Sequence, residues 1–149
     1  MTNHDQHFEK EDAVAISLKF ANQAVGSFLL SDRTPSPWTW EMALGESVKF
    51  PKTGMNAIRF LGTEGALEFP NLVLWRHAEG NGNWHHEIRP EVIDAPFIDA
   101  YVAQCAHLRA VTRGLETPII DALNGSRSLD ATLAAARAAT SGTRIKLSM

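Results

Sequence analysis

The sequence contains a single cysteine, Cys105, among 149 residues. No disulfide can form within the chain, so we expect it to reside in a reduced, cytoplasmic setting. No apolar run reaches the roughly 18 residues that suggest a membrane-spanning helix. The first residues are polar and acidic and lack the apolar core of a secretion signal. The sequence therefore predicts neither a membrane protein nor a secreted one.

An excess of charge of one sign is also missing. The chain has 14 Lys and Arg against 17 Asp and Glu, a formal net charge of −3 at pH 7. This balance gives no electrostatic reason to expect nucleic acid or an anionic membrane as a partner. A hydrophobic content of 44% is ordinary for a globular chain. We predict a flexible N-terminal tail over residues 1–11 and one domain over residues 12–149.

Sequence motifs of cofactor binding and of nucleophilic catalysis are absent. The chain contains no GxGxxG or P-loop, no GxSxG and no HExxH. A metal-dependent hydrolase would need His77, His85 and His86 to converge, but neighbouring residues in a strand point to opposite faces. A solvated loop over residues 77–96 is the better interpretation. We predict no catalytic residue, no cofactor-binding residue and no metal ligand in this chain.

The pattern that is present begins with short strands. Residues 58–75 read as three strands, Ile58–Leu61, Ala66–Phe69 and Leu72–Trp75. Gly62–Gly65 forms the first turn, where the glycines allow positive φ, and Pro70-Asn71 suits the centre of a type I turn. Turns this short join only antiparallel strands, because a parallel return needs a crossover of a dozen or more residues.

A second hairpin is predicted nearer the N-terminus. Ala13–Phe20 alternates between large apolar side chains and small or polar ones, and a turn through Asn22-Gln23 leads to Val25–Asp32. The weakly polar face carries Ala13, Ala15 and Ser17. This composition suits contact with another protein surface, so we expect a homo-oligomer that associates through the open sheet face.

The C-terminal third has helical periodicity. An apolar stripe starts at Phe97 and includes Cys105, which we therefore expect to be buried; Asp94 is the expected N-cap and Gly114 the expected end. A second helix is predicted over Arg127–Ser141, followed by a last strand, Thr143–Leu147. Strands followed by helices predict an α+β fold: an open-faced, mainly antiparallel β-sheet with helices packed on one face.

Three segments together are similar to the C-terminal domain of the Gfo/Idh/MocA family of NAD(P)-dependent oxidoreductases. The first is Ser31-Asp32 with Ser36-Pro37-Trp38-Thr39-Trp40-Glu41, and the second is the run Arg59–Glu68, which resembles the family's "GTEG-small-Leu" hairpin. The third extends from Tyr101–Gly114 through Pro118 and Gly125–Leu129 to Thr140–Gly142, and resembles the "QxxHF…IRG…P…G…SL…A…SAxTG" ending of the family.

The resemblance implies the C-terminal domain fold of the glucose–fructose oxidoreductase and dihydrodipicolinate reductase-like type. In the family one sheet face commonly builds an oligomer interface, and an N-terminal Rossmann domain holds NAD or NADP. That domain, the lysine of the "EKP" motif and the histidine of the "DxxxH" helix are not in this sequence. The chain is then the substrate-side and oligomerisation half of a dehydrogenase for a sugar, inositol or related CH–OH substrate, a fragment or one piece of a split protein, and it is not catalytically competent alone.

The candidate substrate-binding residues lie in the aromatic segment over residues 33–45. Trp38 or Trp40 would form a hydrophobic wall against a sugar-like ring, and Glu41 would accept hydrogen bonds from hydroxyls. Arg33 could pair with a carboxylate or with Glu41. Tryptophans are more often core or interface residues, and this alternative remains open. A free-standing small-molecule-binding or dimerisation module without enzymatic activity also remains open.

Overall fold

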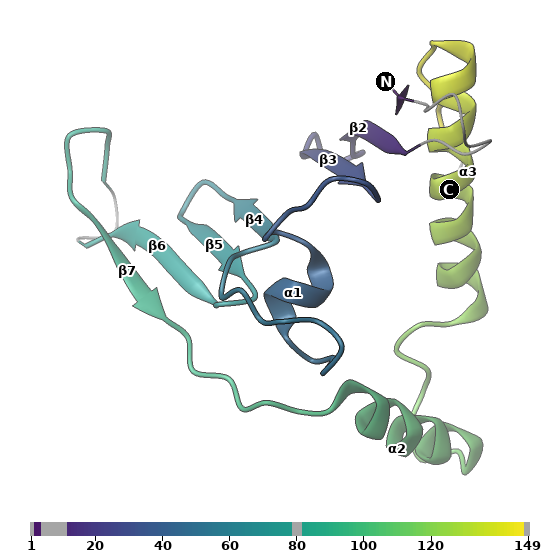
Figure 1. Cartoon of the computed structure of the whole chain (residues 1–149). Helices are drawn as coiled ribbons and strands as arrows, with labels where there is room; N and C mark the ends of the chain where they lie inside the picture. The colour runs from purple at the N-terminus through teal and green to yellow at the C-terminus, as the bar shows by residue number, and fades with distance from the viewer. Residues whose placement is uncertain (1, 4–11, 79–81, 148–149) are drawn as a thin grey trace. The chain divides into compact units, whose positions relative to one another are not determined.

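The computed structural model describes residues 2–3, 12–78 and 82–147, and its chain divides into two compact units. Unit 1 consists of Met1–Thr34 and His107–Met149, and unit 2 consists of Pro35–Ala106. The described strands form two antiparallel sheets, and three helices complete the secondary structure (Figure 1). The α+β class with antiparallel pairing is therefore confirmed, although the strands lie in two sheets where one had been predicted.

The sheet of unit 1 has the strand order β1-β2-β3 and contains the predicted N-terminal hairpin. Its strands are β1 (Thr2–Asn3), β2 (Ala13–Lys19) and β3 (Val25–Ser31). In the hairpin turn, Phe20 N–H donates to Ala24 O at 2.9 Å and Gln23 takes a φ of 71°. Of the predicted tail, residues 4–11 lie outside the described residues, whereas Thr2–Asn3 pair with β2.

The sheet of unit 2 is a meander with the order β4-β5-β6-β7. Three strands confirm the prediction for residues 58–75: β4 (Ile58–Leu61), β5 (Ala66–Phe69) and β6 (Val73–His77). The fourth, β7 (Ile88–Val92), falls within the segment predicted to be a loop. The strand contains Pro90, which cannot donate to a ladder. It is tolerated because β7 is an edge strand.

The tight turn between β4 and β5 closes through a hydrogen bond from Gly62 N–H to Gly65 O at 2.8 Å. The positive φ expected for its glycines is wrong, since the glycines with positive φ are Gly45, Gly54, Gly114 and Gly142. Gly65 is needed for space instead. A Cβ atom at this position would lie 2.6 Å from the carbonyl oxygen of Trp75 on the neighbouring strand.

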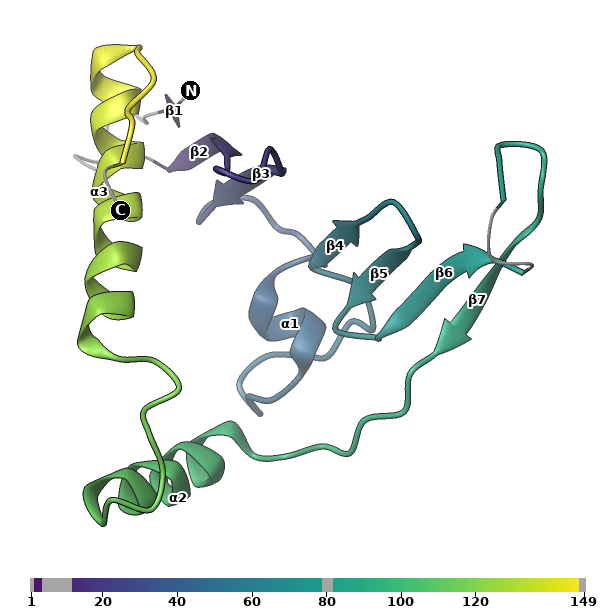
Figure 2. The same cartoon turned by 180° about the vertical axis from the view of Figure 1, so that it is seen from behind.

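The short helix α1 (Trp40–Leu44) occupies the aromatic segment, where the sequence had indicated only an irregular loop. Thr39 caps its N-terminus by accepting the Met42 N–H at 3.4 Å, and Gly45, at φ 68°, caps its C-terminus. Figures 1 and 2, which view the chain from opposite sides, both place α1 beside β4 and β5, far along the sheet from β7.

Helix α2 (Ala100–Thr112) begins later than predicted. Its first turn is capped by Asp99, whose Oδ1 accepts the Val102 N–H at 2.9 Å, and not by Asp94. The predicted end at Gly114 is confirmed by its φ of 71°. Cys105 was expected to be buried, and this is wrong: the thiol is exposed and no residue of α2 is buried.

Helix α3 (Ala122–Ser141) begins before Asn124-Gly125-Ser126, which had been predicted as a turn. Asp121 starts it by accepting the Asn124 N–H at 2.7 Å, so the turn-forming residues are incorporated into its first turns. The predicted C-terminal glycine, Gly142, is confirmed with a φ of 66°. The predicted strand Thr143–Leu147 is wrong, because these residues form no ladder in the structure.

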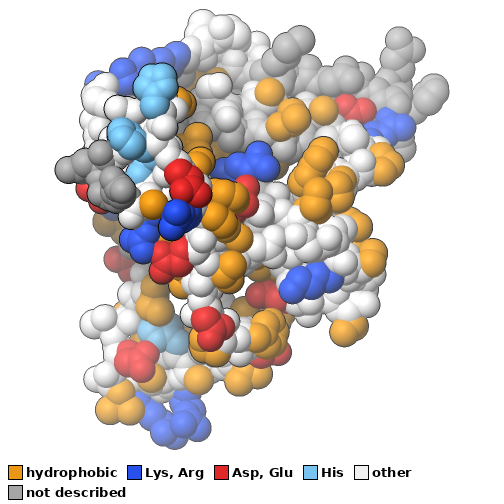
Figure 3. All heavy atoms as spheres, turned by 90° about the vertical axis from the view of Figure 1, so that its left-hand side faces the viewer, with side chains coloured by type: hydrophobic (Ala, Val, Ile, Leu, Met, Phe, Trp, Pro, Cys, Tyr) orange, Lys and Arg blue, Asp and Glu red, His pale blue; other side chains and the backbone are white. Residues whose placement is uncertain are grey.

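Very little of the described chain is buried. The only buried apolar residues are Ala43 of α1 and Ala134 of α3, and many large apolar side chains are exposed in both units. In Figure 3 such side chains are interspersed with charged ones across the face shown. No helix in the described ranges is long and apolar enough to cross a membrane. The exposed apolar surface is therefore available for contacts with other molecules.

Candidate functional site

The aromatic segment of unit 2 is built around α1 and held by one threonine. Thr53 Oγ1 donates to the carbonyl oxygen of Pro37 at 2.8 Å and lies 3.4 Å from that of Met42. Thr53 N–H also donates to Met42 O at 2.9 Å. These bonds attach both the entry and the middle of α1 to the strand-connecting segment that follows it. The tryptophans on either side of Thr39 are therefore fixed to a supported backbone.

The two tryptophans have different environments. Trp40 stacks on Phe69 of β5, with ring centroids 5.5 Å apart and an interplanar angle of 28°. Trp38 makes no such ring contact among the described residues, and 60% of it is exposed. Trp40 is thus the packing member of the pair. Trp38 leaves most of its indole surface open to a ligand.

The two charged candidates also differ. Glu41 lies in the first turn of α1, and its carboxylate makes no hydrogen bond or ion pair with any described residue. Arg33 belongs to unit 1, where its guanidinium lies 3.4 Å from the Asp12 carboxylate. Trp38, Trp40 and Glu41 thus lie within or just before α1 in unit 2, and their role in substrate binding stays a prediction. Arg33 was predicted to pair with a carboxylate or with Glu41; it pairs with the Asp12 carboxylate within unit 1, and its place in a substrate site stays a prediction.

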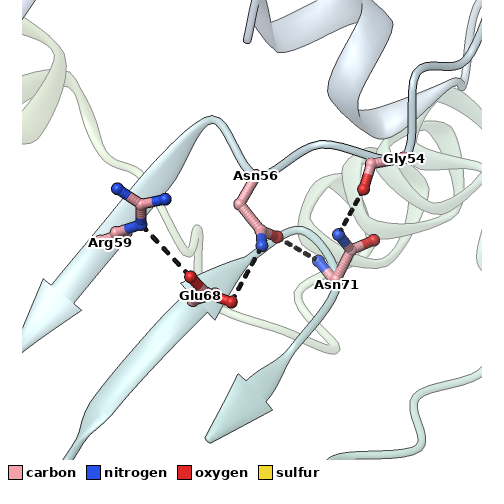
Figure 4. Close-up of polar contacts among 5 residues, drawn as sticks. All are labelled: Gly54, Asn56, Arg59, Glu68 and Asn71. Carbon is pink, nitrogen blue, oxygen red and sulfur yellow. Dashed lines mark hydrogen bonds and ion pairs between the residues drawn. The ribbon is translucent and has the colours of Figure 1, made fainter. Parts of the chain in front are cut away.

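A polar cluster beside this segment fixes the turn between β5 and β6 (Figure 4). Glu68 accepts hydrogen bonds from Asn56 at 3.2 Å and from Arg59 at 3.3 Å. Asn56 Oδ1 accepts the Asn71 N–H at 3.1 Å, and the Asn71 side chain donates to Gly54 O at 2.7 Å. Every amide and carboxylate in the cluster has a partner within it. Its role is to hold the 54–57 segment against the sheet, which also positions Phe69 under Trp40.

Two histidines near the β6–β7 connection interact with each other and with the backbone. His77 and His86 approach each other edge to face with ring centroids 6.4 Å apart, and His86 Nδ1 accepts the Asn83 N–H at 3.0 Å. Among the described residues no group of three or more His, Cys, Asp or Glu side chains is placed to hold a metal ion. A metal-dependent hydrolase built on His77, His85 and His86 therefore gains no support from the described geometry.

His107 forms a carboxylate–imidazole pair that sequence reasoning missed. Its Nδ1 lies 2.6 Å from Glu116 Oε2, and its Nε2 accepts the Ile119 N–H at 3.2 Å. An Nε2 that accepts carries no proton, so the proton sits on Nδ1 and is donated to Glu116. Both ring nitrogens are occupied, so His107 cannot act as a general base here. The sequence signal for this pair was Gly114, because a chain that turns back after the end of α2 can bring Glu116 near His107.

An exposed ion pair at the start of β7 joins Arg89 and Glu87. Arg89 donates to the Glu87 carboxylate at 2.9 Å, and this hydrogen bond together with the charge of Arg89 lowers the pKa of Glu87 below its ordinary value of 4.5. A lowered pKa contributes stability at pH values above the unfolded pKa, and this contribution is lost as pH falls through the folded one. Both groups are exposed, so the ion pair shifts the titration of Glu87 but contributes little to the free energy of unfolding.

We expect the substitution Arg89→Ala to raise the pKa of Glu87 back towards its ordinary value, because it removes both the donor and the charge. An NMR titration of the Glu87 side-chain carboxyl would measure this. Arg76→Ala is a suitable control: Arg76 pairs with Glu91 on the same sheet and should leave the Glu87 titration unchanged. An unchanged Glu87 curve in the Arg89 variant would contradict the ion pair.

Comparisons of the chain with protein-family models, with curated proteins and with solved structures gave no match. The family membership implied by the sequence motifs therefore stays a prediction.

Proposed function

We propose that this chain forms the substrate-side and oligomerisation part of an NAD(P)-dependent oxidoreductase that acts on a sugar, inositol or related CH–OH substrate. The dinucleotide would be held by a Rossmann domain, and the catalytic lysine and histidine of the family would lie outside these 149 residues. The weakly polar face carrying Ala13, Ala15 and Ser17 contributes to self-association.

The observation that carries the proposal is that Trp38 is 60% exposed and that the carboxylate of Glu41, three residues further on, has no hydrogen-bond or ion-pair partner among the described residues. Sugar and polyol rings present an apolar face and a rim of hydroxyl donors. A flat aromatic surface suits the ring face, and a carboxylate accepts hydrogen bonds from the rim.

The sequence motifs support the same interpretation. The Gly62–Gly65 turn, which belongs to the segment that resembles the family hairpin, requires a glycine at position 65 because of the nearby Trp75 carbonyl. In the Trp38-Thr39-Trp40-Glu41 segment, Thr39 caps the helix and Trp40 contacts the sheet, whereas the ring of Trp38 is exposed. Glu41, which has no side-chain partner among the described residues, is available to a ligand.

Titration with myo-inositol and glucose, followed by tryptophan fluorescence and calorimetry, tests the proposal. We expect weak, saturable binding that Trp38→Ala and Glu41→Gln each weaken at least about tenfold, the change that corresponds to about 1.4 kcal/mol. Trp84→Ala is the matched control, because Trp84 is fully exposed in the β6–β7 connection and far along the chain from α1. NAD and NADP should not bind to the chain alone.

Two results would count against the proposal. One is binding of myo-inositol or glucose that survives both Trp38→Ala and Glu41→Gln, which would place the ligand elsewhere. The other is complete absence of binding by any cyclic polyol or sugar, which would favour a dimerisation module without a substrate.

A further inference from the structure

The outer strand of the unit 1 sheet has an unusual composition for an exposed edge. β3 is seven residues long, Val25–Ser31, and contains neither a charged residue nor a proline. Val25 and Leu29 are 78% and 82% exposed. Natural sheets protect such edges with charges, prolines or very short strands, because an open edge is a template for pairing with another strand.

The other described sheet shows that protection. Its edge strand β7 has the sequence IRPEV, so Pro90 interrupts the row of donors and Arg89 and Glu91 add charge. The opposite edge, β4, is only four residues long and carries Arg59. β3 is therefore the longest edge strand of the described sheets and the one without these features.

The hydrogen-bond pattern shows which backbone groups of β3 are directed outward. Bonded and non-bonded pairs alternate along antiparallel strands. Phe20 N–H donates to Ala24 O at one end of the hairpin, and Asp32 N–H donates to Asp12 O at the other. The residues of β3 that lie between these two bonds therefore alternate in direction. Four of them direct their backbone N–H and C=O groups away from β2: Val25, Ser27, Leu29 and Ser31.

We propose that β3 pairs with β3 of a second copy of this chain, so that the two sheets join edge to edge across a two-fold axis. A second copy is the fitting occupant because an uncharged strand is compatible with itself, and antiparallel pairing of identical strands gives the closed, isologous contact of a dimer. The contact does not depend on the proposed oxidoreductase role. It also differs from association through the sheet face that carries Ala13, Ala15 and Ser17.

The register follows from the same alternation. Centring the axis on Phe28 pairs all seven residues of each strand and places every outward-directed group opposite another one. Phe28 then faces its own copy at a non-hydrogen-bonded position, where side chains are closest, and the aromatic pair adds stabilisation. Leu29 faces Ser27 of the other copy, so large side chains lie opposite small ones.

The area of contact sets the expected affinity. A seven-residue strand is roughly 23 Å long at about 3.3 Å per residue. An edge pair of this length lies near the lower limit of roughly 1,000 Å² for a specific interface, so we expect a weak, reversible dimer.

Sedimentation velocity over a concentration series, with hydrogen exchange of the β3 amides, tests the proposal on the full chain. We expect a monomer–dimer equilibrium in which Leu29→Lys and Ser27→Pro each weaken association at least about tenfold. Ser27→Pro removes an outward donor without removing a bond to β2, which proline at an edge allows. Exchange at Ser27 and Leu29 should slow as the dimer forms.

Two control variants make the result specific. Leu61→Lys changes a leucine of equal exposure, 83%, on the edge strand β4 of unit 2 and should leave the dimer unchanged. Ser17→Lys places a charge on the weakly polar face of β2, so it should weaken association through that face and leave the dimer-dependent slowing of exchange at Ser27 and Leu29 unchanged. Circular dichroism would confirm that each variant keeps the wild-type secondary structure.

Several outcomes would overturn the edge-to-edge dimer. A strict monomer at high concentration would contradict the dimer. If the β3 amides of that monomer were protected from exchange at every concentration, β3 would be covered by its own chain. A dimer that resists both Leu29→Lys and Ser27→Pro, or one that only Ser17→Lys disrupts, would place the contact on another surface.

Discussion

Replacing Gly65 with alanine should lower the free energy of unfolding of unit 2 by about 1–3 kcal/mol, the usual cost of forcing atoms into an occupied site. The added Cβ would lie 2.6 Å from the carbonyl oxygen of Trp75, and that oxygen belongs to the backbone of the central strand β6. A flexible side chain could move aside, but here β5 and β6 must separate locally. Chemical denaturation followed by tryptophan fluorescence would measure the change.

The same turn supplies the control. At Gly62 the nearest atom to an added Cβ is Gly65 O at 3.4 Å, which is ordinary contact, and the φ of Gly62 is not positive. Gly62→Ala should therefore change stability by less than about 0.5 kcal/mol, as is usual for surface positions. Equal losses in the two variants would show that the turn is disturbed by any side chain, and the close approach of Gly65 to β6 would lose its role.

The antiparallel strands were predictable because their signal is local. Period-two alternation in residues 13–20, and two short turns in residues 58–75, fix pairing partners that lie close together in the sequence. The C-terminal glycines of the long helices were predictable for the same reason. Gly114 and Gly142 take the positive φ that ends a helix at little cost to glycine.

The predictions of helix starts and of one edge strand were wrong where individual residues decide the local structure. Asp99 and Asp121 start α2 and α3 by capping, and from the sequence several aspartates and prolines compete for that role. β7 was missed within residues predicted to be a loop; its Pro90 fits a strand only at a sheet edge, and the strand order that shows this edge is not visible in the sequence. Thr143–Leu147 alternates like a strand but finds no partner strand in the structure.

The candidate site was predictable in part. Its residue types stand out in the sequence, since two tryptophans and a carboxylate follow two prolines. It was not predictable that Trp40 packs on the sheet while Trp38 stays exposed, because this depends on Phe69, which is distant in sequence. Arg33 was grouped with them by proximity along the chain, yet it belongs to unit 1, where it pairs with Asp12.

Replacing Trp40 with alanine should destabilise unit 2 by about 2 kcal/mol, roughly half the cost of truncating a fully buried tryptophan, because Trp40 is 50% exposed. The substitution removes the stack on Phe69, which is the aromatic contact between α1 and the sheet. Thermal and denaturant unfolding of the full chain would measure the loss. Phe69→Ala and the double variant should show a coupling of about 0.5–1.5 kcal/mol between the two rings.

Trp38→Ala is the companion experiment and connects stability with function. Trp38 is 60% exposed and has no ring partner among the described residues, so its removal should change the unfolding free energy by less than about 0.5 kcal/mol. The proposed ligand site makes the opposite prediction for binding, which should weaken strongly. A Trp38 variant that loses as much stability as the Trp40 variant would identify both rings as structural, and the aromatic segment would no longer be a candidate for substrate binding.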